Sequence, residues 1–584
     1  MGNASREVVT LQLGHYSNFV GTHWWNLQDA ALCYDGEPNN SYSEINSNVL
    51  FREGVTLQGQ PTYTPRLILM DLKGSLSSLK QEGALYGVSQ TEPALTWKGS
   101  LSVHKEDPVV KNQFLQQLDR LGDELNSNSN SRPFQGEERA AAVPGAERAL
   151  NLSQSSHRLE DSVGVWSDYL RVHLHPKTIS VIQQYNHSST SDRFEAFGFG
   201  EKLIRDPLFL DDFEDRLHFY IEECDYLQGF HILCDLQDSF AGLSTKVVEL
   251  LNDEYGGKGI FTCGFSPASY TDTSPVKEVH RLLNSFMGIV QLSSRSSIFC
   301  PMSLNRNALG RKRPSPINFP HIIYDASLSY HSSAVLAMAL ETLTIPYRLH
   351  SGGISLSQLT DALNPAGRKV ISASASVPFP MRDTDTIPDV LCRQQAAMLW
   401  TGLTPCGDFQ ESQCFAQSVV IRGVSNERQI SNLAPGVKGP SVLHSCPTGE
   451  DVLSTFLHSY FPTALSAVHL AQTPCSVASP YPQFFSPSLN KQGQLLGGGL
   501  SASACAVQSI PVMSTLQSSP VLYSVLHSLY REVSSLNLRK FSAFLSAGTE
   551  LDDFREVLEE LNTLSQCYKM NFDMDESGDD SDGE

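Results

Sequence analysis

The chain has 584 residues, of which 40% are hydrophobic and 18% charged, values typical of a globular protein with a large core. Its 63 acidic and 42 basic residues give a net charge of −21, which argues against general nucleic-acid binding but leaves room for a local basic patch. The 12 cysteines form no C-x-x-C pair and no secretory signal opens the chain, so we expect free thiols in a reducing compartment. No apolar run reaches roughly 18 residues and no presequence is evident, so we expect no transmembrane helix.

Two apolar runs near the N-terminus predict strands. Residues 6–13 (REVVTLQL) are rich in β-branched side chains, and residues 65–73 (PRLILMDLK) are apolar without alternation, which indicates a strand buried on both faces of a parallel sheet. The segment GHYSNFVG (14–21) follows the first strand and leads into a helix. We expect Trp24 and Trp25 of that helix to be core anchors.

The stretch CDYLQGFHILCDLQDSFAG, residues 224–242, predicts a turn, a buried strand, a loop and the start of a helix. An amphipathic helix over 209–226 leads into it, and the apolar residues 231–234 form the strand. Helical spacing resumes over 243–255 and ends at Gly256-Gly257.

The loop that joins this strand to this helix is a candidate ligand site. Because a helix N-terminus favours anions, α/β folds bind phosphates at such loops. Its sequence here is Gln237-Asp238-Ser239-Phe240-Ala241-Gly242. Glycines would let backbone N–H groups face a phosphate, whereas Asp238 brings a negative charge and Phe240 adds bulk. We therefore expect weak or no nucleotide binding, no catalytic residues and no cofactor.

The segment Val172-His173-Leu174-His175 alternates like a strand, which would put both histidines on one face. Two histidines at this spacing are a candidate metal site. No cluster of cysteines or acids supplies a third ligand, so we interpret them as structural and expect no metal.

Two polar segments are interpreted as irregular structure. Residues 125–158 contain an Asn-Ser repeat followed by prolines and small residues, which indicates a flexible linker. Arg311-Lys312-Arg313 lies in a Pro/Ser-rich stretch, and we interpret it as a solvated loop, with a localisation signal as the alternative.

The C-terminal half predicts alternating strands and helices, then two closing helices. A strand is expected over 258–264, helices over 279–292, 334–342, 522–536 and 549–568, and a Ser/Pro/Gly-rich loop region over 471–520. Thr549, with Asp552 three residues later, predicts a capping box for the last helix. Residues 573–584 carry acids and no base, so we expect a disordered tail, in which Ser577 and Ser581 are candidate phosphorylation sites.

These segments resemble tubulin in order and spacing. Residues 224–230 match its cysteine-x-LQGF turn and strand, and GHYSNFVG resembles its first nucleotide loop, with Gly14, Asn18 and Gly21 matching. PRLILMDLK resembles the tubulin segment that ends near the metal and phosphates. Residues 371–380, which end in VPFP, and 414–423 (CFAQSVVIRG) resemble strands of tubulin's second domain. The two closing helices resemble the closing hairpin of tubulin, in the same order.

The resemblance implies degenerate nucleotide-type loops made by Gly14, His15, Asn18, Asp71, Lys73, Gln237, Asp238, Ser239 and Gly242. Ser17 replaces a tubulin glycine, and Lys73 stands where the family has an acid. The loop 363–369, where tubulin carries an acid that acts on the neighbouring subunit's nucleotide, is basic here, and Asp361 is the nearest alternative.

The expected fold is α/β and tubulin-like: a Rossmann-type parallel-sheet domain, a second α/β domain and a C-terminal helical hairpin. The segments are 1–124 (first half of the Rossmann-type domain), 125–158 (linker), 159–350 (remainder of that domain), 351–470 (second domain), 471–520 (loop region), 521–570 (hairpin) and 571–584 (acidic tail).

The opening REVVTLQLGHYSNFVGTHWW, the segment PRLILMDLKGSLSSLK and the linker identify the chain as resembling the Misato family, tubulin-like proteins of mitochondrial distribution and morphology. The resemblance implies a non-catalytic protein of the cytoplasm and the cytosolic face of the mitochondrial outer membrane, which regulates mitochondrial distribution, morphology and fusion. It implies peripheral membrane association and protein partners there, with tubulin or its chaperone machinery as candidates, and no nucleic acid. The alternative is a GTP-binding, assembling GTPase, or a tubulin-folding or spindle factor.

Overall fold

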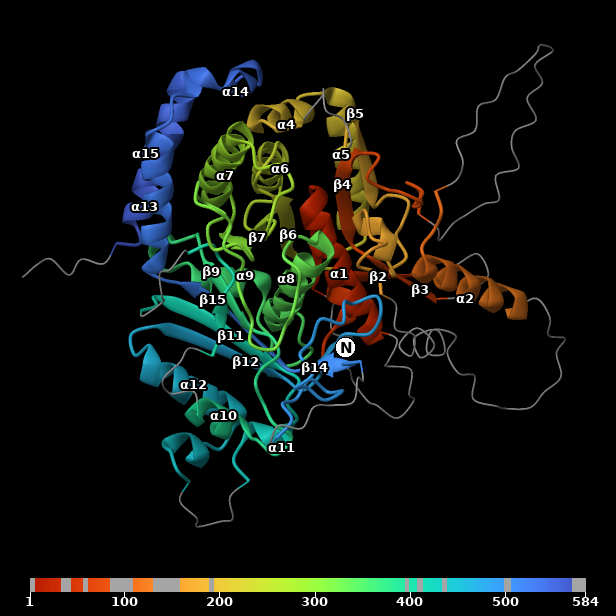
Figure 1. The fold of residues 1–584 in the computed structure, drawn as a ribbon, viewed down its shortest axis with the longest axis vertical. Helices are drawn as coiled ribbons and strands as arrows, with labels where there is room; N and C mark the ends of the chain where they lie inside the picture. Colours follow the sequence, from red (N-terminus) through yellow and green to blue (C-terminus); the bar gives the residue numbers. More distant parts are fainter. Residues whose placement is uncertain are drawn as a thin grey trace, which may run out of the picture.

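The computed structural model describes residues 6–32, 44–55, 61–83, 109–129, 158–187, 194–393, 399–406, 413–432, 439–497 and 506–569 (Figure 1). The candidate phosphorylation sites Ser577 and Ser581, the acidic tail and residues 130–157 of the expected linker lie outside these ranges.

A six-stranded parallel sheet forms the first domain. Its strands are β1 (Glu7–Leu13), β4 (Leu67–Lys73), β5 (Ile179–Asn186), β6 (Leu227–Asp235), β7 (Gly259–Ser266) and β8 (Ile298–Ser303), in the order β5-β4-β1-β6-β7-β8. Leu13 of β1 pairs with Met70 of β4 and with Cys234 of β6. The carboxyl ends of β4, β1 and β6 therefore lie side by side, at the edge where open α/β sheets bind ligands.

Helices cover both faces of this sheet, as expected for a Rossmann-type fold. On one face α1 (His15–Leu32) and α8 (Ser329–Leu343) pack together, and the predicted core anchors Trp24 and Trp25 are buried there. The other face is covered by α5 (Pro207–Glu222), α6 (Phe240–Glu254) and α7 (Pro275–Arg295), with the short α4 (Phe197–Ile204) packed against α6. Of the helices in the described part of the chain, none is long and apolar enough to cross a membrane.

A five-stranded mixed sheet forms the second domain and lies below the first sheet in Figure 1. Its strands are β9 (Ser372–Ser376), β10 (Thr401–Gly402), β11 (Ala416–Arg422), β12 (Leu465–Ala471) and β15 (Val512–Ser518), in the order β10-β9-β15-β11-β12. The helices α10 (Ile387–Arg393) and α12 (Gly449–Tyr460) pack on it. The remaining elements are η1 (Ser47–Val49), β2 (Phe51–Val55), β3 (Pro61–Pro65), α2 (Gln113–Ser129), η2 (Trp166–Tyr169), η3 (Ile345–Tyr347), α9 (Leu356–Leu363), η4 (Pro365–Gly367), α11 (Asn426–Gln429), η5 (Val442–Ser445), β13 (Cys475–Ser476) and β14 (Ser509–Ile510).

The closing hairpin consists of α13 (Val521–Ser534), η6 (Leu538–Lys540), α14 (Ser542–Ser546) and α15 (Leu551–Gln566), and α13 and α15 pack together against α7. Phe554 and Leu561 of the predicted stripe are buried, and Phe554 packs against Phe286 with ring centroids 5.6 Å apart. Beyond α15, the Tyr568 hydroxyl donates to the Val370 carbonyl at 2.8 Å, which fixes the hairpin to the junction of the two sheets.

Three local predictions are wrong. Residues 172–175 form no strand: Val172 and Leu174 are buried in the core, which explains the alternation, but the backbone joins no ladder. Helix α15 begins after Glu550 rather than Thr549, without a side-chain cap. Helix α2 continues to Ser129, so the expected linker is helical over 125–129.

The loop interpretation of 471–520 is also wrong at its C-terminal end. Residues 512–518 (VMSTLQS) form β15, a fully buried strand with a partner on each side. Its polar residues do not show the apolar pattern of a core strand. Pairing with β9 and β11 satisfies the backbone N–H and C=O groups of this segment, and these partners cannot be recognised from the local sequence.

A buried ion cluster joins the two domains. Glu341, at the end of α8, binds Arg348 at 2.7 Å through one carboxylate oxygen and Arg422 of β11 at 3.1 Å through the other. All three side chains are buried. The Arg422 guanidinium also donates to the Thr473 and Pro474 carbonyls, at 3.1 and 3.2 Å. One carboxylate therefore bridges two guanidinium groups and holds the second sheet to the central helix.

We predict that Glu341→Ala lowers the free energy of unfolding by about 3–5 kcal/mol, because it leaves two buried arginines without their counter-ion. Glu249→Ala is the control: Glu249 binds Lys246 at 2.8 Å at the partly exposed surface, so its loss should cost below about 1 kcal/mol. Urea unfolding followed by tryptophan fluorescence measures both. Equal effects of the two substitutions would contradict the role given to Glu341.

Candidate functional site

The candidate site is the edge of the first sheet where β1, β4 and β6 end. Gly14 follows β1, Asp71 lies in β4 and Asp235 ends β6. Gly14 has φ +124°, and a Cβ there would lie 2.5 Å from the Asp235 carboxyl carbon. Glycine is thus required at position 14 by backbone conformation and by the close approach of an acid.

The Asp235 carboxylate occupies the N-terminus of α1. Its two oxygens accept the backbone N–H groups of Tyr16 at 2.9 Å and of Ser17 at 2.7 Å, and the side chain is 1% exposed. The N–H groups of a first helical turn are the donors that bind a phosphate in α/β folds. In this chain they are already bound to an acidic side chain of the protein itself.

Asp71 is the centre of a second set of contacts. One carboxylate oxygen of Asp71 meets His15 Nδ1 at 3.0 Å and accepts from Trp166 Nε1 at 2.8 Å and Asn18 Nδ2 at 3.2 Å. Burial alone would raise the pKa of Asp71, but the nearby His15, with hydrogen bonds from His15, Leu72 N–H and Asn18, holds it below its ordinary value. Asp71 is therefore an ionised carboxylate fully engaged by protein donors.

His15 is also held from its other side. Its ring lies against that of His187, with centroids 4.0 Å apart. Burial, followed by the neighbouring His15, lowers the pKa of His187. Lys73, in contrast, is exposed at the end of β4, and its carbonyl accepts the His187 N–H at 2.9 Å. The structure thus brings His15, Asn18 and Asp71 together as predicted, but gives the Lys73 side chain no place in the cluster.

The loop from Gln237 to Gly242 makes close intramolecular contacts. The Ser239 hydroxyl donates to the Ala196 carbonyl at 2.6 Å, and Asn284 donates to the Gln237 carbonyl at 2.9 Å. A Cβ on Gly242 would lie 2.0 Å from the Phe197 carbonyl oxygen. Ser239 and Gly242 therefore serve the contact between α4 and α6.

Asp238 and Asp235 form an acidic pair. Asp238 accepts the Phe240 N–H at 2.9 Å in an Asx-type turn before α6. Burial raises the pKa of Asp238 to about 7, against the Phe240 hydrogen bond. Burial and the Asp238 charge raise the pKa of Asp235, against its two N–H donors. The pair therefore retains a proton near neutral pH.

Tyr16 fills the space between α1 and α8. Its side chain is 4% exposed, and its hydroxyl donates to Ser332 Oγ of α8 at 3.0 Å. Burial raises the pKa of Tyr16, so the hydroxyl stays neutral and acts as a donor. This aromatic ring closes the crevice beside the α1 N-terminus.

Sequence reasoning assigned no role in this site to Asp235, Trp166, His187 or Tyr16. Asp235 carried a usable signal, because it is the first acid after a buried strand and ligand-side groups follow the carboxyl ends of parallel strands. Trp166 and His187 come from distant segments, and no local pattern points to them.

Other candidate residues do not assemble a site. His175 stacks on Phe219 with ring centroids 4.7 Å apart, and burial, followed by Arg52, lowers its pKa to about 4. Asp361 is exposed on α9. In the basic loop, the Arg368 guanidinium lies 4.0 Å from the Phe415 ring and Lys369 donates to the Ser294 carbonyl at 2.7 Å, so both serve intramolecular contacts. Within the described ranges, no group of three His, Cys, Asp or Glu side chains is placed to hold a metal.

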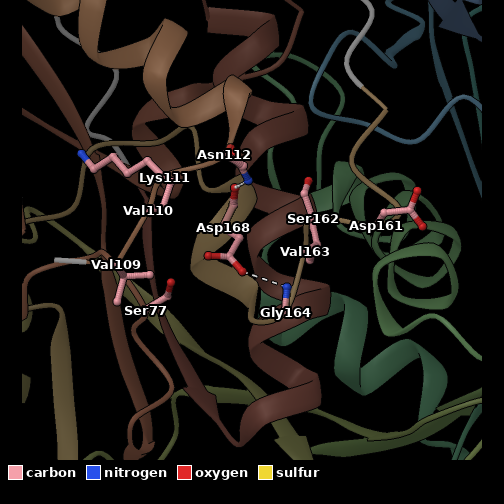
Figure 2. Close-up of a pocket in the computed structure, with 10 residues that line it drawn as sticks. All are labelled: Ser77, Val109, Val110, Lys111, Asn112, Asp161, Ser162, Val163, Gly164 and Asp168. Atoms are coloured by element: carbon pink, nitrogen blue, oxygen red, sulfur yellow. Dashed lines mark hydrogen bonds between the residues drawn. The ribbon is translucent and has the colours of Figure 1, made fainter. Parts of the chain in front are cut away.

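A hollow of about 510 Å³ lies elsewhere on the first domain (Figure 2). It is lined by Ser77, residues 109–112, residues 161–164 and Asp168, and by none of the loop residues above. The Asp168 carboxylate accepts the N–H groups of Gly164 and Val165 at 2.8 and 3.0 Å, so this acid is engaged in its own turn. We assign the hollow no ligand.

We predict that Asp238→Asn stabilises the protein above neutral pH. An acid whose folded pKa exceeds its unfolded value contributes stability in its protonated form, and that contribution is lost as pH rises through about 7. Asparagine keeps an acceptor for the Phe240 N–H and cannot ionise. The gain should be on the order of 2 kcal/mol at pH 8.5 and smaller at pH 6.

Thermal unfolding midpoints of both proteins between pH 6 and 8.5 measure this difference, and histidine titration cancels because both chains carry the same histidines. Curves that stay parallel over this range would show that Asp238 is already ionised at pH 6.

Comparison with known proteins supports the tubulin-like fold. Residues 6–120 match the Misato Segment II tubulin-like domain, and residues 155–349 match a tubulin domain. Protein misato homolog 1 of Bos taurus is 48% identical over 569 residues, 97% of this chain and 99% of that protein. Protein misato homolog 1 of Danio rerio is 48% identical over 595 residues, 100% of both chains. Protein misato of Drosophila melanogaster is 29% identical over 580 residues, 97% of this chain and 98% of that protein. The chain therefore belongs to the misato family of tubulin-like proteins.

Proposed function

We propose that this chain is a non-catalytic tubulin-like protein that acts through protein partners and requires no nucleotide. The observation that supports this most strongly is the Asp235 carboxylate, which accepts the Tyr16 and Ser17 N–H groups at the start of α1. A phosphate at this helix end would need the same donors.

Electrostatics oppose a nucleotide here. Asp71, Asp235 and Asp238 surround the α1 N-terminus, and the charges of Asp71 and Asp238 reach Asp235. Each ionised carboxylate repels a phosphate by about 1–4 kcal/mol at a separation of 4 Å and surface-like dielectrics. The buried Tyr16 ring, whose hydroxyl donates to Ser332, adds bulk next to the same N–H donors. The alternative of an assembling GTPase would require all of these side chains to move.

The cellular role that we propose rests on the family resemblance: regulation of mitochondrial distribution, morphology and fusion from the cytosolic face of the outer membrane. The chain would associate there peripherally through protein partners, with a coexisting cytoplasmic pool. Tubulin, or the machinery that folds it, is the candidate partner that the tubulin-like fold favours. A role as a tubulin-folding or spindle factor would use the same fold without the mitochondrial surface.

We expect the purified native chain to carry no stoichiometric guanine nucleotide and to show no saturable heat when titrated with Mg-GTP. Mass spectrometry of the small molecules released on denaturation, together with calorimetry, measures both. The informative variant is Asp235→Ala, which frees two helix-end donors, whereas substitutions at Gly14 or Gly242 would disrupt packing. One bound GTP per native chain would contradict the proposal.

In cells depleted of the protein, we expect a fragmented or clustered mitochondrial network that the native chain restores. Asp238→Asn should restore it equally well, because this proposal gives the loop no chemical task. Phe554→Asp should fail, because it buries a charge in the contact between α15 and α7. Protein abundance is measured alongside network shape. An abundant, folded Asp238→Asn protein that fails to rescue would contradict the proposal.

A further inference from the structure

A rigid hairpin presents the basic cluster of the chain. Asn305 and Pro316 form an isolated bridge at its base, and the Asn305 side-chain carbonyl accepts the N–H groups of Asn307 at 3.0 Å and Ser315 at 2.9 Å. The Asn307 amide donates to the Arg313 carbonyl at 2.8 Å across the hairpin. These hydrogen bonds therefore give the hairpin a defined backbone conformation.

The hairpin is fixed to α13, more than two hundred residues later in the chain. Glu532 of α13 accepts the backbone N–H of Arg311 at 2.8 Å, and a Cβ on Gly310 would lie 3.1 Å from the same carboxylate. Leu309 is buried in the core that α13 shares with the first domain. Because Glu532 holds the backbone of residue 311, the Arg311 side chain is left to project.

The charge of this surface has the opposite sign to that of the whole chain. Arg306, Arg311, Lys312 and Arg313 are exposed, as is Arg531 beside Glu532, and among the described residues none of the five makes an ion pair. No acid occurs between residues 296 and 324, although the chain carries a net charge of −21. We call these five residues the basic hairpin surface.

We infer that the basic hairpin surface is a docking site for an extended acidic segment of a partner protein. Arginine binds carboxylates through paired N–H donors, and consecutive basic side chains on a fixed backbone match acids spaced along an extended peptide. Because these basic side chains make no ion pair within the described ranges, binding of such a segment breaks no existing ion pair.

The net charge favours a slender peptide over a membrane. Charges are screened over about 8 Å at physiological ionic strength, so a peptide lying on the hairpin experiences mainly the local basic field. An anionic bilayer would face a much wider area of a chain whose net charge is −21. A nucleic acid is disfavoured for the same reason, because its phosphates would extend beyond the hairpin over the rest of a negatively charged chain.

The test measures binding of a fluorescein-labelled dodecapeptide of aspartate and glutamate to the full chain by anisotropy. The triple variant Arg311→Gln, Lys312→Gln and Arg313→Gln should raise the Kd at least tenfold, and affinity for the native chain should fall as salt rises. The triple variant Lys80→Gln, Arg205→Gln and Lys491→Gln is the matched control, because it removes the same charge from three scattered exposed positions and should change the Kd less than twofold.

Further arms make each outcome decisive. The variant Arg311→Lys and Arg313→Lys keeps the charge but loses the paired N–H donors, so its Kd should lie between those of the native chain and the hairpin triple variant. Circular dichroism should show the native fold in every variant. The matching asparagine and glutamine peptide should not bind. Equal losses in the two triple variants, or no binding of the acidic peptide to the native chain, would overturn the inference. The inference would also be overturned if vesicles of phosphatidylserine and phosphatidylcholine bound the native chain but not the hairpin variant, and the acidic peptide did not bind.

Discussion

The pairing of the Asp235 carboxylate with the first turn of α1 is the contact on which the ligand edge of this fold depends. It joins the end of β6 to the helix that follows β1, across 218 and 219 residues of sequence. It requires glycine at position 14, because a side chain there would meet the acid. A helix N-terminus left without an acceptor has unsatisfied N–H donors, and in this chain the protein itself supplies the acceptor.

The second acid, Asp71, is satisfied in the same manner by His15, Asn18 and Trp166, and the Tyr16 ring closes the remaining space against α8. Asp235, Asp71 and the first N–H donors of α1 therefore all have partners within the protein. Away from this edge, Glu341 joins the two domains through Arg348 and Arg422. Internal contacts of acidic side chains thus connect the elements both at this edge and at the junction between the sheets.

Much of the fold could be predicted from local pattern. Continuous apolar runs such as 65–73 indicated buried parallel strands, and the spacing of Phe554 and Leu561 gave the correct face of α15. Strand β15 escaped because its polar residues VMSTLQS are stabilised by two neighbouring strands rather than by an apolar pattern. At residues 172–175 a strand was predicted where none forms, because side chains can be buried alternately in a segment whose backbone has no strand partner.

The site was predictable only in part. The motif positions His15, Asn18 and Asp71 meet as expected, but the roles of Gly14 and Gly242 depend on packing against Asp235 and Phe197, which a sequence pattern does not reveal. Trp166 reaches Asp71 across 95 residues, and its position follows from the whole fold. Long-range contacts, not local composition, determine whether the loop is open or sealed.

The most direct test of a sealed nucleotide edge is an experimental structure of the native chain from crystals grown with millimolar Mg-GTP. The account predicts that both Asp235 oxygens remain on the N–H groups of Tyr16 and Ser17 and that the Tyr16 hydroxyl still reaches Ser332. Phosphate density at the start of α1, with the Asp235 side chain rotated away, would contradict it.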